Sequence, residues 1–453
     1  MLKFKSHQHL GCLLAVSCTL CTGPLGWLAH VAWLVVAIYC ALDIRYMVGA
    51  IFFYSTFFIP IGFAQNFIFS VKHFHLIMVI TTVIQLVRGT FWETLQSGLK
   101  GASRFAAVIL IVAIALMSNL MHVRSMSAVR IGANLMLTFC SVVFLFGLID
   151  GYLYRLKIGI LSYIYGFSVQ SVIGYLNDFA GTTFLKIQLI HNDHLGVFFA
   201  MTFFLCIPFA MTEKSRIKRW CYIFLASVIF AGLAYTCTRT AWVSVVVITA
   251  AMYVAVQCLA SKSRYLKIFN VRFWLLGCLI VALLGHLLIA TNFLDYAIER
   301  WKGILAPLHA YYWQYAMSDN NFGFFGIFRL QQFYSLKAIL KSHLFFGVGF
   351  TNEVIGYHSL YFTILGASGI TGMAVFVSFV YKIFRQYSRS IAETRSFKTL
   401  IVKVAVLASF AVWLLCSFMQ TLLLQYAVWT NVLMVIYFAV HTNKKISFLS
   451  SKS

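Results

Sequence analysis

Basic side chains in the second half of the chain could hold a phosphate group. Arg239 lies in the stretch LAYTCTRTAW and is the only charged residue between Arg219 and Lys262. A cation at the centre of a membrane-spanning helix costs about 2.5–3.5 kcal/mol on insertion scales. Since so apolar a stretch keeps this cation, we expect Arg239 to lie at a membrane surface and to bind an anion.

A second group of cations lies in the stretch FRLQQFYSLKAILKSHLFFGVGF. Arg329 stands near its start, and we predict an amphipathic helix that ends at Gly347. Lys337 and Lys341 follow Arg329 at spacings of eight and then four residues, so the three cations fall roughly on one face of that helix. A solvated or headgroup-facing edge explains the two lysines better than a ligand site does.

His358 follows in YHSLYFTILGASGITG, where the chain is predicted to re-enter the membrane. Two arginines and a histidine at one membrane surface suit a phosphate-bearing ligand, because guanidinium groups match phosphate oxygens in pairs. A lipid diphosphate would place its anion at this depth and its tail between helices. Each side chain also has a structural explanation. Arg239 could cap the preceding helix, Arg329 could be an ordinary surface charge, and His358 could bond to backbone.

The elements that must position these residues are membrane helices. Hydrophobic residues make up 62% of the chain and charged residues 10%. Apolar runs long enough to cross a membrane recur along it, so we predict an all-α, polytopic integral membrane protein with about 12–14 transmembrane helices. The predicted ranges are 10–23, 27–43, 46–63, 70–87, 104–122, 131–149, 158–175, 195–212, 220–236, 240–260, 273–292, 359–381, 399–418 and 422–441.

Short basic loops predict the orientation, because they are retained in the cytoplasm. With both termini in the cytoplasm, the cytoplasmic segments collect a large set of cations. They include Lys214, Arg216, Lys218, Arg219, Lys262, Arg264, Lys267, Arg272, Lys382, Arg385, Arg389, Arg395, Lys398 and Lys403. Residues 176–194, the turn 236–240 and the long loop 293–358 then lie together on the outer, periplasmic face.

The long loop 293–358 is too rich in aromatic residues for disorder, so we expect one large helical periplasmic loop on the outer membrane surface. The chain then divides into four parts. They are N-terminal membrane helices in 1–175, central membrane helices bearing the Arg239 turn in 176–292, the periplasmic loop in 293–358, and C-terminal membrane helices in 359–453.

The charged residues also argue against several functions. The formal net charge of +24 would suggest nucleic acid as a partner of a soluble protein, but membrane topology explains it here, so no nucleic acid is expected. All 11 acidic residues lie in predicted loops or near helix ends, which disfavours a proton- or sodium-coupled transporter. They form no cluster at metal-ligand spacing, so we expect no metal and no other cofactor.

The order of these features resembles the O-antigen ligase and O-antigen polymerase superfamily of bacterial envelope enzymes. The resemblance covers roughly residues 190–381. It consists of the TCTRTAW turn with Arg239, the long outer loop, the stretch that begins with Arg329, and the glycine series that follows His358. Two features depart from the family pattern. The residues HLFF stand before GVG where many members have a proline, and Ser359 follows the histidine where asparagine is frequent.

The resemblance implies a metal-independent, inverting glycan transfer at the periplasmic face of the bacterial inner membrane. The donor would be an oligosaccharide on undecaprenyl diphosphate. Arg239 and Arg329 would bind the diphosphate and stabilise it as leaving group, with Lys337 and Lys341 as further diphosphate-binding residues. His358 would position or deprotonate the acceptor hydroxyl, or help to neutralise the departing phosphate. The lipid bilayer and a chain-length regulator protein are the further candidate partners.

Polymerase and ligase share this donor and differ in the acceptor. A polymerase extends another lipid-linked repeat unit, whereas a ligase delivers the glycan to a lipid A core. The stretch YHSLY lacks the His-x-His-Asn pattern associated with several ligases, which favours an O-antigen polymerase. The alternative from another class is a flippase for lipid-linked oligosaccharides. That alternative predicts one deep cavity lined by Lys72, His75, Arg124 and Arg130 together with Arg239.

Overall fold

The computed structural model describes most of the chain outside its two ends and one central segment. The described residues are 35–56, 73–102, 106–123, 126–179, 192–260, 325–394, 397–418 and 426–440, except 36, 41, 151 and 237. Within them the structure is all-helical, as predicted, and contains no strands. The predicted helices 10–23 and 273–292 lie outside the described residues, as do most of 27–43 and residues 293–324 of the predicted loop.

The described helices are α3 (Ile44–Tyr54), α4 (His73–Val87), α5 (Phe91–Ala102), α6 (Ala106–His122), α7 (Met126–Ile149), α8 (Leu153–Phe179), α9 (Asn192–Thr212), α10 (Arg216–Thr236), α11 (Arg239–Ala260), α15 (Phe325–Ser342), α16 (Asn352–Ile355), α17 (Leu360–Ala392), α18 (Phe397–Cys416) and α19 (Tyr426–Val440).

Five of the described helices contain a stretch long and apolar enough to cross a membrane. These stretches are Ala128–Ile149, His194–Thr212, Arg216–Thr236, Leu360–Ala392 and Lys398–Cys416. A sixth candidate is the pair α4 and α5, which together pass the same test but are bent by 119° at the break between them. The chain is therefore a helical protein with several candidate membrane spans, consistent with a polytopic membrane protein.

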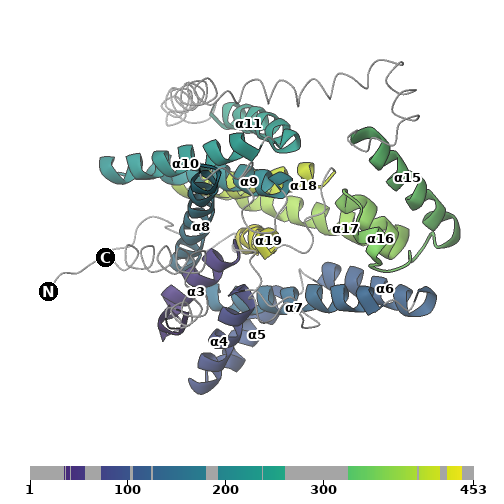
Figure 1. Ribbon diagram of the computed structural model, residues 1–453. Helices are drawn as coiled ribbons and strands as arrows, with labels where there is room; N and C mark the ends of the chain where they lie inside the picture. Colours follow the sequence, from purple (N-terminus) through teal and green to yellow (C-terminus); the bar gives the residue numbers. More distant parts are fainter. Residues whose placement is uncertain are drawn as a thin grey trace, which may run out of the picture.

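The centre of the bundle is formed by helices that are apolar on every side. α19 lies in the middle of the bundle, and its side chains from Ala427 to Ala439 are all buried (Figure 1). α9 is buried along nearly its whole length. A helix that is apolar all round is stable when it is buried among other helices or in the apolar part of a membrane. α9 packs against α10 and α18, and α19 packs against α17 and α18, so these helices form one core.

One helix, α5, was not among those predicted from the sequence. It packs along the second half of α7 at very close range. A Cβ atom at Gly98 would lie 2.3 Å from the carbonyl oxygen of Val143, and one at Gly147 would lie 2.0 Å from that of Thr94. Glycine on both helices therefore permits the close approach of their backbones.

Two predicted boundaries are wrong. α15 ends at Ser342 rather than at Gly347, because the following residues bond to another helix instead of continuing the α-helical ladder. α17 continues to Ala392 rather than ending near 381, so its basic last turns are helical.

Lys403 was assigned to a cytoplasmic loop, and that assignment is also wrong. It lies within α18 and is 2% exposed. Its ammonium group donates to the carbonyl oxygen of Ser390 at 2.9 Å, to the hydroxyl of the same serine at 2.6 Å, and to Thr394 Oγ1 at 2.8 Å. The last turn of a helix leaves carbonyl groups unsatisfied and attracts cations, so Lys403 caps the end of α17.

Candidate functional site

Arg239 is the first residue of α11 and follows a very short turn after α10. Its side chain lies outside the described residues, so the backbone alone places it. The turn packs onto the first turns of α9, because a Cβ atom at Gly196 would lie 2.3 Å from Thr238 Oγ1 and 2.6 Å from Thr236 Oγ1. The start of α11, the end of α10 and the start of α9 therefore meet at one end of the bundle.

The start of α17 lies at the same end, and α18 connects the two. Ser244 of α11 lies 3.3 Å from Cys416 at the end of α18, measured from Oγ to Sγ. The next residue, Ser417, accepts a hydrogen bond from the backbone N–H of Leu360 at 2.9 Å. Ser244 is five residues from Arg239, or about 7.5 Å along the helix. The backbone of Arg239 and that of His358, two residues before α17, are thus at the same end of the bundle.

The backbone at His358 is held by a glutamine of α15. Gln332, which is 7% exposed, donates from Nε2 to the carbonyl oxygen of Gly356 at 3.1 Å. Its Oε1 accepts a hydrogen bond from the backbone N–H of His358, also at 3.1 Å. The histidine side chain itself is exposed. One amide side chain therefore fixes the turn while the imidazole stays accessible.

A second set of bonds ties α15 to the residues just before His358. Ser335 donates a hydrogen bond to the carboxylate of Glu353, and its Oγ lies 2.7 Å from the hydroxyl of Tyr357. Burial raises the pKa of the Tyr357 phenol, so this hydroxyl stays protonated at neutral pH and can donate. Thr363 of α17 donates to the carbonyl oxygen of Val354 at 3.3 Å. The segment before α17 is therefore anchored from both α15 and α17.

The helix that follows His358 is broken. Gly369 in α17 has a φ of 63°, and its helical ladder is interrupted there. A Cβ atom at this glycine would lie 2.4 Å from the carbonyl oxygen of Phe345, so only glycine fits. A break in an apolar helix exposes backbone groups, and these need other partners inside a membrane.

Residues 343–350, which follow α15 as a turn and irregular backbone, supply those partners. The N–H groups of Val348 and Gly349 donate to the carbonyl oxygens of Gly366 and Ala367, both at 2.9 Å. In return, the N–H groups of Ile370 and Thr371 donate to the carbonyl oxygens of Leu344 and Phe345, at 3.0 and 3.2 Å. These four bonds join residues 343–350 to the broken part of α17.

The GVG element has a structural role in this arrangement. Gly347 and Gly349 have φ values of 65° and 83°, which favour glycine. A Cβ atom at Gly347 would lie 2.3 Å from the carbonyl oxygen of Gly366, and one at Gly349 would lie 2.7 Å from that of Ala115 in α6. The two glycines therefore let residues 343–350 lie between α6 and α17.

The three cations of α15 fall within an arc of about 120° around that helix, which is roughly one face, and Arg329 is at the edge of the arc nearest Gln332. The side chain of Arg329 is outside the described residues, but position 329 precedes Gln332 by three residues, a spacing that shares a helix face. Lys337 and Lys341 are exposed and lie about 140° and 180° around the helix from Gln332. The two lysines are thus on the side away from His358, and their role in binding diphosphate stays a prediction.

Sequence reasoning did not single out the residues that hold His358 in place. Gln332, Ser335 and Tyr357 carry no charge and follow no catalytic spacing. The available signal was weak: a pair of adjacent glutamines inside a predicted amphipathic helix. For a metal, the described residues contain no group of three or more His, Cys, Asp or Glu side chains that could bind an ion.

The fold and this site define a helical protein with several candidate membrane spans and one broken helix next to an exposed histidine. The sequence matches no model of a known protein family, and it matches no curated protein either.

Proposed function

We propose that this protein is an O-antigen polymerase, a membrane glycosyltransferase that uses a glycan on undecaprenyl diphosphate as donor. One observation carries the proposal. The exposed His358 and the start of α11 at Arg239 lie at one end of the bundle, joined through Ser244, Cys416 and Ser417. The residue proposed as base or clamp and the residue proposed as phosphate-binding cation are therefore at the same end of the bundle although they are far apart in the sequence.

The helix directions at this end add to the case for an anionic ligand. α9, α11 and α17 all begin here, at Asn192, Arg239 and Leu360. The first turn of a helix has unpaired N–H groups and the positive end of the helix dipole, which together favour bound anions. A diphosphate next to these helix starts would be stabilised by them and by Arg239.

The proposed reaction needs little beyond positioning and charge stabilisation. An acceptor hydroxyl attacks the anomeric carbon from the side opposite to the diphosphate. A new glycosidic bond forms, and the diphosphate leaves with the electron pair of the broken bond. The hydroxyl proton passes to His358 or, if this histidine instead neutralises the leaving phosphate, to water. Arg239 and Arg329 would stabilise the charge that develops on the leaving group.

The distribution of cations supports a periplasmic site in the bacterial inner membrane. α10 begins next to Lys214, Arg216 and Lys218, at its end farther from Arg239, and α17 ends with Arg385 and Arg389, far from His358. Basic residues concentrate on the cytoplasmic side of membrane proteins. The site is therefore proposed to face the periplasm.

Two alternatives follow from the same structure. An O-antigen ligase would use the same donor and the same residues but would deliver the glycan to lipid A core. A flippase for lipid-linked oligosaccharides is favoured by the broken helix α17, since transporter sites are often built on broken helices. It comes second because the four backbone groups flanking Gly369 are bonded to residues 343–350 and so have partners other than a substrate.

Genetic complementation tests the proposal. Strains that lack either their O-antigen polymerase or their ligase, with the correct repeat unit supplied, receive wild-type protein, Arg239→Ala, His358→Ala or Arg216→Ala. Lipopolysaccharide is then separated on a gel, and the amount of each protein in the membrane is measured. We expect wild type and Arg216→Ala, whose change lies at the other end of α10, to restore a ladder of long chains in the polymerase-null strain. Arg239→Ala and His358→Ala should fail at equal protein level.

The other outcomes separate the alternatives. Restoration in the ligase-null strain alone identifies a ligase. Restoration in neither strain, at normal protein level, overturns the proposal of a transferase and favours transport. A ladder that survives both Arg239→Ala and His358→Ala would show that the reaction does not depend on this end of the bundle.

A further inference from the structure

A groove with a volume of about 970 Å³ lies between α6 and α17. Leu110 and Ala107 line it from α6, and Ala374, Phe379 and Lys382 line it from α17. This volume is at the upper end of the range of small-molecule sites in proteins.

α6 and α17 pack against each other, and the groove lies beside their contact. Near Gly372 they are in contact, since a Cβ atom there would lie 3.9 Å from Ile111 Cγ2. Further along α17 the facing residues Ala107 and Ala374 are too small to fill the space between the helices. Leu110 is 49% exposed, so the groove is open at its side. In a membrane, lipid would fill an apolar opening of this kind.

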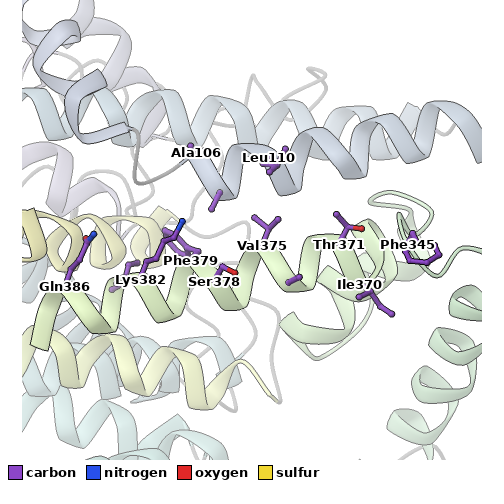
Figure 2. A pocket seen from close by; sticks show the side chains of 13 residues that line it. Ala106, Leu110, Phe345, Ile370, Thr371, Val375, Ser378, Phe379, Lys382 and Gln386 are labelled. Carbon is purple, nitrogen blue, oxygen red and sulfur yellow. The ribbon is translucent and has the colours of Figure 1, made fainter.

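The two ends of the groove differ in chemistry. Lys382 and Gln386 lie at one end and Phe345 lies at the other (Figure 2). Lys382 is exposed, and within the described residues no carboxylate lies at ion-pair distance from it. Arg385 and Arg389 follow on the next turns of α17, also exposed. One end of a mainly apolar groove is therefore positively charged.

The length of the groove suits one lipid of a single leaflet. From Ile370 to Gln386 is 16 residues, or about 24 Å along an α-helix. A bilayer including its headgroups is about 40–45 Å thick, so one lipid takes up about 20–22 Å from headgroup to chain end. A lipid with its headgroup beside Lys382 would reach with its chains close to Phe345.

We propose that this groove binds one membrane phospholipid with an anionic headgroup. The headgroup phosphate contacts Lys382, with Gln386 beside it, and the acyl chains lie along Leu110 and Ala374. The site is distinct from the end of the bundle that holds His358, because Lys382 is on the opposite end of α17. The inference does not depend on the proposed glycan transfer.

Lipid titration of the purified full chain in detergent tests the proposal. The chain is first stripped of lipid, and phosphatidylglycerol or phosphatidylcholine is then added. Native mass spectrometry counts bound lipid, and thermal unfolding measures the stabilisation. We expect wild type to bind one phosphatidylglycerol more tightly than phosphatidylcholine. Lys382→Gln should weaken the binding of phosphatidylglycerol about fivefold, which is the effect of one cation near a headgroup. The binding of phosphatidylcholine should stay unchanged.

Two further variants make the test specific. Ala374→Trp fills the apolar part of the groove and should weaken the binding of both lipids. Lys218→Gln removes an exposed cation from α10 and should change neither. The proposal is overturned if Lys382→Gln keeps the full preference for phosphatidylglycerol. It is equally overturned if Lys218→Gln loses as much affinity for phosphatidylglycerol as Lys382→Gln does. It is also overturned if undecaprenyl diphosphate displaces phosphatidylglycerol from the groove, since the groove would then hold the tail of the donor.

Discussion

Replacing Gln332 by leucine is the sharpest test of how the candidate site is built. The side chain is buried, and its two hydrogen bonds hold the backbone on both sides of Tyr357. Leucine has a similar volume and keeps the apolar packing of α15, but it can neither donate to Gly356 nor accept from His358. The change therefore removes the support of the histidine without touching the histidine itself.

The expected cost in stability is small. A hydrogen bond contributes about 0.5–1.5 kcal/mol net, so two of them contribute about 1–3 kcal/mol. Gly356 and His358 are exposed, so their freed backbone groups can bond to water and the lower figure applies. The expected cost in activity is larger, because a displacement of about 1 Å at a reacting group can reduce the rate about 100-fold.

The assay is chain extension of a purified undecaprenyl-diphosphate-linked repeat by the full-length protein, with the thermal midpoint measured in the same detergent. Gln332→Glu is the informative second variant. Its carboxylate still accepts from the N–H of His358 but cannot donate to Gly356, so its activity should fall between those of wild type and Gln332→Leu. Ser342→Ala serves as the control on the same helix, since among the described residues the hydroxyl of Ser342 bonds to carbonyl groups of α15 itself.

The reasoning is refuted if Gln332→Leu extends chains at the wild-type rate while His358→Ala does not. The position of the histidine would then be set by something other than this glutamine. A loss of folded protein equal to the loss of activity would also count against it, because the glutamine would then be a structural residue alone.

Further predictions concern the fold. Gly347→Ala should lower the thermal midpoint strongly and reduce the amount of folded protein, because its Cβ would lie 2.3 Å from the carbonyl oxygen of Gly366 at a φ of 65°; a midpoint within 1 °C of wild type would contradict this. The Arg45 side chain hydrogen-bonds to the carboxylate of Asp43 and lowers its pKa. A carboxyl group whose pKa is lowered by folding adds stability at pH values above its pKa in the unfolded chain. This stability is lost as the pH falls through the pKa of the group in the folded protein. Asp43→Asn should therefore cost a little stability at neutral pH and nothing in strong acid, as thermal melts across pH will show.

The positions of the long helices could be predicted from hydrophobic runs, because each run must be buried or face lipid. The same rule fails where an apolar stretch is not helical. The sequence predicts that the helix before residues 343–350 continues to Gly347, but backbone groups of these residues bond to α17. Hydrophobicity reports that these residues are buried and says nothing of where their N–H and C=O groups find partners.

The helix α5 was missed for the opposite reason. Its residues FWETLQSGLKGA are too polar for a membrane span, so hydrophobic runs do not reveal the helix. They do form an amphipathic pattern, with Phe91 turned toward Phe144 of α7 and Trp92 exposed. The close approach to α7 depends on Gly98 and Gly147, and two glycines in separate segments cannot be matched without the fold.

Within the candidate site, the two kinds of residue differ in what their replacement can reveal. The turn at His358 is fixed by bonds to its backbone, from Gln332 on one side and through Leu360 to Ser417 on the other. The exposed imidazole makes neither of these bonds. His358→Ala should therefore leave the turn in place and report on the chemistry, whereas Gln332→Leu reports on position. If both variants lose activity while only Gln332→Leu loses stability, His358 acts on the substrate and not on the fold.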